Sequence, residues 1–129
     1  MSSIIKIIKQ RADLFYEKGA SEDSIIKAEN ILKLQLSDDY KEYVRAFGAV
    51  SYSGHELTGF STDKNLDVVY ATLKNRKNNP YVTFSLYVIE ETHIDGIVIW
   101  QDSAGAIFQT RYKEPPVKIF ECLADYIAM

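Results

Sequence analysis

The chain has 129 residues, of which 47% are hydrophobic and 26% are charged, and its formal net charge is −3. This length is typical of one domain, residues 1–129, built around a single core. The lone Cys122 excludes an internal disulfide, no apolar run reaches the roughly 20 residues of a membrane span, and the N-terminus lacks a signal-peptide pattern. These features predict a soluble, cytoplasmic protein.

The first segment, residues 3–18, predicts an amphipathic helix that ends at Gly19. Its apolar residues at helical spacing are Ile4, Ile5, Ile8, Ala12 and Phe15. Ile7 and Leu14 lie off this face, and the wider stripe fits either a deeply packed helix or an exposed edge for a partner.

Two further helices follow at short spacing. Ser21 is a natural N-cap for the first, with Ile25, Ala28 and Leu32 on its apolar face. The next helix carries complete start and stop signals, because Ser37 precedes two aspartates and Gly48 follows the last turn. Its expected core-facing residues are Leu36, Tyr40, Tyr43, Val44 and Phe47.

After Gly48 the pattern changes to short strands. Residues 49–52 and 56–60 predict two strands, and Gly59 within the second indicates a bulge or a close backbone approach. A short helix beginning near Leu66 cannot continue through Pro80.

The remainder of the sequence predicts a β-meander and a closing helix. Residues 81–88 alternate in polarity, residues 97–100 are continuously apolar, and residues 106–111 follow a turn, so we expect three antiparallel strands. Pro115 and Pro116 precede an expected final helix, in which the apolar residues are Ile119, Phe120, Leu123, Tyr126 and Ile127.

These elements together predict an α+β fold. N-terminal helices should pack on a central antiparallel sheet of about five strands, with a helical crossover and a C-terminal helix.

The charges are unevenly distributed. Residues 1–50 contain eight acids and eight bases, whereas residues 78–110 contain no Lys or Arg. The acids of this second stretch are Glu90, Glu91, Asp95 and Asp102, which the sequence leaves without a basic neighbour. They fit either solvated turns or an acidic surface that attracts a basic protein. Either interpretation disfavours direct nucleic-acid binding, because a basic footprint is missing.

Catalytic and metal-binding motifs are missing from the sequence. His55 and His93 have no second ligand at metal-site spacing, and Cys122 has no activating neighbour. Glu90 and Glu91 are adjacent on an expected strand end and should point to opposite faces. A binding protein without enzyme activity, cofactor or metal ion is therefore expected. An enzyme would need a pocket that gathers one of the histidines with carboxylates.

The segment 19–48 resembles the N-terminal signature of the SUKH superfamily. The residues that match are Leu36, Tyr40, Tyr43, Phe47 and Gly48, and Ser37 stands where the family often has proline. The later order of a Gly-containing strand, a helical crossover, a meander and a terminal helix agrees with the same family.

This resemblance implies a bacterial immunity protein, the antitoxin of a polymorphic or contact-dependent toxin. Such toxins are commonly nucleases, which the immunity protein neutralises by direct binding. The family also includes regulatory proteins, so a regulatory or scaffolding domain with a different partner is the alternative. The sequence leaves a monomer and a weak dimer both open.

The expected toxin-binding residues are the acids of the strand-rich part of the chain: Glu56, Asp63, Asp67, Glu90, Glu91, Asp95 and Asp102. Tyr52, Tyr87 and Trp100 are candidate aromatic anchors, although the apolar run around Trp100 also fits a core position.

Overall fold

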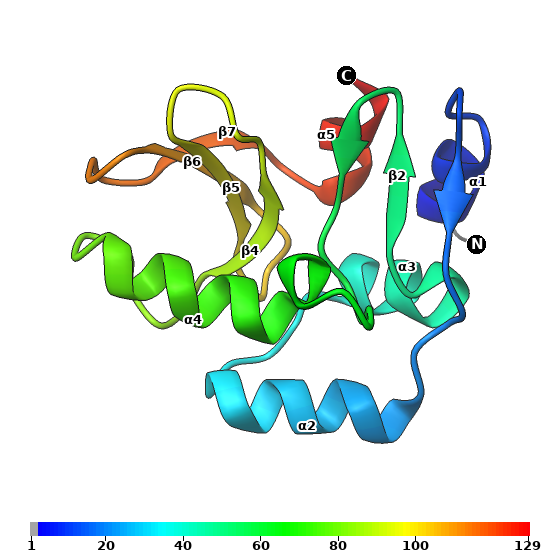
Figure 1. Ribbon diagram of the computed structural model, residues 1–129, viewed down its shortest axis with the longest axis horizontal. Coiled ribbons are helices and arrows are strands. Elements are labelled where there is room, and N and C mark those ends of the chain that lie inside the picture. The colour runs from blue at the N-terminus through cyan, green and yellow to red at the C-terminus, as the bar shows by residue number, and fades with distance from the viewer. Residues whose placement is uncertain (1–2) are drawn as a thin grey trace.

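The computed structural model describes residues 3–129, which form an α+β domain with two antiparallel sheets (Figure 1). The α-helices of this part of the chain are α1 (Ser3–Lys9), α2 (Glu22–Leu32), α3 (Asp38–Phe47), α4 (Val68–Asn78) and α5 (Leu123–Ala128). A 3₁₀ turn, η1 (Lys64–Leu66), precedes α4. None of these helices has the length and apolar content needed to cross a lipid bilayer.

The strands form sheets of three and four, rather than the expected sheet of about five. The first sheet has the order β1 (Phe15–Tyr16), β2 (Val50–Tyr52), β3 (His55–Glu56). The second has the order β4 (Tyr87–Glu91), β5 (Ile97–Gln101), β6 (Ile107–Arg111), β7 (Val117–Phe120). Figure 1 shows the four-stranded sheet above α4, with the β2–β3 hairpin standing beside it.

The capping signals of α2 and α3 are confirmed. The Ser21 hydroxyl accepts a hydrogen bond from the Ser24 amide at 3.2 Å, and the Ser37 hydroxyl accepts one from the Tyr40 amide at 3.2 Å. Gly48 ends α3 with a φ of +71°. The five residues expected on the core side of the third helix, Leu36, Tyr40, Tyr43, Val44 and Phe47, are all buried.

The first predicted helix is too long. The structure ends α1 at Lys9, and Asp13 takes a positive φ of 56°, so the chain turns before Phe15. Phe15 and Tyr16 then pair with Ser51 and Val50 of β2. Backbone pairing across 35 residues therefore overrides the local helical pattern, and Phe15, expected in the core, is 74% exposed.

Two predictions for the second sheet are wrong. Residues 81–86 form turns instead of the first half of a strand, and β4 begins only at Tyr87. Residues 117–120 form β7, paired with β6, instead of the start of the last helix. The strand assignment of residues 97–100 is confirmed, because β5 is a central strand.

The four-stranded sheet separates two apolar clusters. The larger one joins α1, α2, α3, α5 and the first sheet to Ile89, Ile99 and Ile107. The smaller one lies between α4 and the sheet and consists of Ala71, Val82, Leu86, Val88 and Trp100. Trp100 is completely buried, as a core residue should be, and its indole N–H donates to the Thr110 hydroxyl at 2.9 Å.

Gly59 brings the end of α3 and the start of α4 together. A Cβ at this position would lie 1.9 Å from the Gly48 carbonyl oxygen, so only glycine fits. The Gly59 amide donates to Leu66 and its carbonyl accepts from Val68. The close backbone approach predicted for Gly59 is confirmed, and it fixes η1 and α4 beside β3.

Candidate functional site

Three of the seven predicted binding acids meet around one surface hollow, which we call the acidic hollow. It has a volume of about 270 Å³ and lies between β3, η1, α4 and the end of β4. Its lining residues are Glu56, Thr58, Asp63, Asn65, Leu66, Lys74, Glu91 and His93. The lining has three carboxylates and one lysine, so its net charge is negative.

Each of these acids is held by a different element. Glu56 ends β3 and is exposed, and Asp63 caps η1 by accepting the Asn65 amide at 3.0 Å. Glu91 ends β4, where its carboxylate accepts from Lys74 Nζ at 3.0 Å and from Asn75 Nδ2 at 2.8 Å. The expectation that Glu91 has no basic neighbour is wrong, because α4 brings Lys74 to it.

Glu90 points to the other side of β4 and does not belong to the acidic hollow. The residue is only 3% exposed, and its carboxylate accepts hydrogen bonds from His55 Nδ1 at 3.0 Å, from the Glu56 amide at 2.9 Å and from the Tyr126 hydroxyl. The expectation of a solvated acid at Glu90 is therefore wrong. Its role in this structure is to tie β3 and α5 to β4.

This buried carboxylate also affects two tyrosines. Burial raises the pKa of the Tyr126 hydroxyl far above its ordinary value, and the negative charge of Glu90 raises this pKa further. The pKa of Tyr52 is raised by the same two causes. Both hydroxyls therefore stay protonated, and Tyr126 can donate its proton to Glu90 in a hydrogen bond.

The other predicted acids differ in position. Asp67 caps α4 by accepting the Tyr70 amide at 3.0 Å and follows Leu66, which lines the acidic hollow. Asp95 is exposed in the β4–β5 turn, two residues after His93, which also lines the hollow. Asp102 follows the opposite end of β5, where it accepts the amides of Ala104 and Ala106. Five residues of strand separate the two turns by about 17 Å, so the structure does not bring Asp102 to the others.

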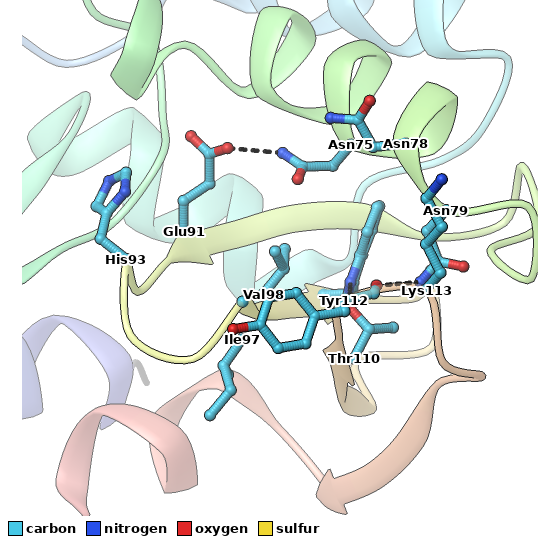
Figure 2. Close-up of a pocket in the computed structure, with 12 residues that line it drawn as sticks. Asn75, Asn78, Asn79, Glu91, His93, Ile97, Val98, Thr110, Tyr112 and Lys113 are labelled. Carbon is cyan, nitrogen blue, oxygen red and sulfur yellow. Dashed lines mark hydrogen bonds between the residues drawn. The ribbon is translucent and has the colours of Figure 1, made fainter.

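A second hollow adjoins the first, and we call it the α4 cavity. It has a volume of about 560 Å³ and lies between the C-terminal half of α4 and the four-stranded sheet (Figure 2). Its lining residues are Asn75, Asn78, Asn79, Glu91, His93, Gly96, Ile97, Val98, Trp100, Thr110, Tyr112 and Lys113. Glu91 and His93 line both hollows, so the two adjoin at these residues.

Sequence reasoning missed most of the α4 cavity. The three asparagines lie in or next to the polar run that ends α4, and Tyr112 lies in the β6–β7 turn with a positive φ of 52°. Figure 2 shows the Tyr112 ring beside Ile97 and Val98, and it packs against Gly96. The repeated asparagine in residues 75–79 is the one local signal that singles out this segment.

The aromatic anchor candidates are interior residues. Tyr52, Tyr87 and Trp100 are each at most 4% exposed. The Tyr87 hydroxyl accepts the Ser37 amide at 2.9 Å and donates to Gln101 Oε1 at 2.7 Å, which links α3 to β5. These side chains support the fold and cannot project from the surface as anchors that insert into a partner.

The structure places both histidines near carboxylates. His55 pairs with Glu90, and His93 lines the acidic hollow with Glu91. In the described residues the His55 ring has hydrogen bonds only with Glu90, and the nearby Ser53 hydroxyl donates to the Ala12 carbonyl at 3.2 Å. No described group of three or more His, Cys, Asp or Glu residues is arranged to hold a metal ion.

Comparison with protein families gives a match over almost the whole chain. The sequence model of the family SUKH_5, described as SMI1-KNR4 cell-wall, matches residues 1–126. The search of curated proteins gave no match. Proteins of the SUKH superfamily are generally non-enzymatic immunity proteins. The chain belongs to the SUKH_5 family of the SUKH immunity superfamily.

Proposed function

We propose that this chain is an immunity protein that binds a cognate bacterial toxin, a basic nuclease domain, and neutralises it by direct contact through the acidic hollow. The toxin would be bound in the cytoplasm, where the chain needs no cofactor. Family membership supports an immunity role and a toxin partner. The choice of the binding surface and of a basic partner depends on the negative charge of the acidic hollow.

The observation that carries this choice is the convergence of Glu56, Asp63 and Glu91 on one hollow with a single lysine. Nuclease surfaces that bind phosphates are rich in Lys and Arg, and complementary charge accelerates association and excludes wrong partners. Asp67 and Asp95 extend the acidic surface at its border. Glu90 and Asp102 lie outside the proposed contact.

The test is a double charge reversal on the exposed part of the hollow, Glu56→Lys with Asp63→Lys. The partner is the toxin domain encoded next to the gene of this chain, used in active form for growth rescue and in inactivated form for binding. We expect the double variant to lose at least about a hundredfold in affinity and to fail to rescue growth, because like charges then face each other.

Glu121→Lys supplies the matched control. Glu121 is exposed and its carboxylate pairs with Lys118 at 2.9 Å. Its backbone lies beside Gly105 of the β5–β6 turn, at the end of β5 opposite the acidic hollow. This variant should bind and protect as the wild type does. Unchanged binding and protection by the double variant would refute the proposed surface. If the wild type binds a protein other than the toxin and gives no protection, a regulatory or scaffolding role replaces the immunity role.

A further inference from the structure

The α4 cavity carries an inference that rests on the proposed function and refines it. We infer that this cavity is an anchor site that receives one large apolar side chain of the partner, while basic residues of the same partner face the acidic hollow. This assignment depends on the apolar base of the cavity, on the hydrogen bonds of its polar side chains and on the two residues that it shares with the acidic hollow.

The base of the cavity is apolar. Val98 and Trp100 are two residues apart on β5 and belong to the cluster that α4 covers. The Tyr112 ring forms part of the wall, and this side chain is exposed. A cavity of about 560 Å³ is within the range of sites that bury most of a bound group, and it has room for an aromatic side chain.

Three polar side chains in the wall, Thr110, Asn79 and Asn75, already have hydrogen-bond partners within the chain. The Thr110 hydroxyl accepts from the Trp100 indole at 2.9 Å, and the Asn79 amide donates to the carbonyl groups of Tyr112 and Glu114 at 3.1 and 3.0 Å. The Asn75 amide donates to Glu91 and to the Ala71 carbonyl. A polar ligand would have to break these bonds, whereas an apolar side chain needs none of them.

The position of the cavity favours a protein side chain over a free small molecule. Glu91 and His93 line both this cavity and the acidic hollow, so a partner held by its basic residues presents its neighbouring side chains to the cavity. Interfaces obtain much of their affinity from a few aromatic residues that fill such pockets, surrounded by polar contacts that exclude water. The exposed rim residues Asn78 and Lys113 can supply those surrounding contacts.

The test closes the mouth of the cavity with Asn78→Trp. Asn78 is exposed, so the change leaves the core intact. Leu73→Trp is the control, because Leu73 is 46% exposed and lines a different hollow with Ile31 and Phe84. We expect Asn78→Trp to weaken binding of the inactivated toxin domain about tenfold or more and Leu73→Trp to change it less than about twofold. Val98→Phe, which fills the cavity from its base, should act as Asn78→Trp does.

Trp100 is the only tryptophan of the chain, so 5-fluorotryptophan gives one ¹⁹F resonance at the base of the cavity. This resonance should shift when the toxin domain binds, and the shift should be lost with Val98→Phe, which keeps Trp100 as the only tryptophan. If both cavity variants bind like the wild type while Glu56→Lys with Asp63→Lys does not, the anchor is wrong and the proposed function stands.

If the toxin domain does not bind the wild type, the proposed function fails, and N-acetyltryptophan amide becomes the probe of the cavity. A ¹⁹F shift that Val98→Phe abolishes then supports an apolar side-chain site, and no shift refutes it.

Discussion

Two consecutive glutamates at the end of β4 have opposite environments. Glu90 faces inward, where His55, the Glu56 amide and Tyr126 surround its carboxylate, and Glu91 faces the acidic hollow with Lys74 and Asn75. The inner side therefore holds β3, β4 and α5 together, and the outer side is available to a partner. Changes on the inner side should affect stability, and changes on the outer side should affect binding.

The largest expected effect is a loss of stability at alkaline pH. It comes from buried tyrosines on the inner side and does not involve the acidic hollow. Burial holds the pKa of Tyr40, Tyr43 and Tyr87 well above the ordinary value of about 10. Above pH 10 the unfolded chain releases these protons and the folded chain keeps them. The free energy of unfolding should therefore be unaffected by these groups below about pH 10 and fall by about 1.4 kcal/mol per tyrosine for each pH unit above it.

Urea unfolding between pH 8 and pH 11 measures this fall. Absorbance at 295 nm should show that these tyrosines ionise together with unfolding. Ionisation of all nine tyrosines in the folded protein would contradict the assignment of the buried ones.

The next largest effect is expected for Glu90→Ala. The variant leaves the buried Tyr126 hydroxyl and two partly buried donors, His55 Nδ1 and the Glu56 amide, without their acceptor, so the free energy of unfolding should fall by about 2 kcal/mol. Chemical denaturation measures the fall, and Tyr126→Phe, which removes one of the three donors, should cost about 1 kcal/mol. The folded fraction of Glu90→Ala should still bind the toxin domain; loss of binding at full folding would place Glu90 on the outer side.

Glu91→Gln should weaken binding with little loss of stability, the reverse of Glu90→Ala. Its ion pair with Lys74 is partly buried, but glutamine keeps an oxygen that can accept from Asn75, so the free energy of unfolding should fall by only about 1 kcal/mol. Association with the toxin domain should slow several-fold at low salt in stopped-flow measurements. Glu121→Gln, which breaks a more exposed pair with Lys118, should leave the association rate unchanged. Equal rates for wild type and Glu91→Gln would remove Glu91 from the proposed surface.

The smallest effect is expected for Asp102→Asn. The asparagine keeps an oxygen that can accept the amides of Ala104 and Ala106, so the turn should persist. Affinity for the toxin domain should change less than about twofold by calorimetry, because Asp102 is at the far end of β5. A larger loss would extend the contact surface to that end of the sheet.

Local signals in the sequence were sufficient for part of the fold. The helices with capping serines, α2 and α3, begin where expected, and α3 ends at Gly48 as expected, because these signals act within one turn. The last helix was overextended, because residues 117–120 pair with a strand that is distant from the helical pattern. Phe15 was misplaced for the same reason.

The site was harder to predict, because side-chain direction depends on register. A β-bulge between Val88 and Glu90 shifts the alternation of β4 at the point where the two glutamates lie. The partners of Glu91 come from α4, and no sequence spacing relates Lys74 to this strand end. Composition did identify Glu56, Asp63 and Glu91 as candidates, but only the fold brings them to one hollow.

The ionic-strength dependence of the association rate tests the central proposal most directly. The wild type and the triple variant Glu56→Gln, Asp63→Gln, Glu91→Gln would be mixed with the inactivated toxin domain at about 20 to 500 mM salt. A steep fall in rate with salt for the wild type and a nearly flat dependence for the triple variant are expected. The same slope for both proteins would contradict binding through the acidic hollow.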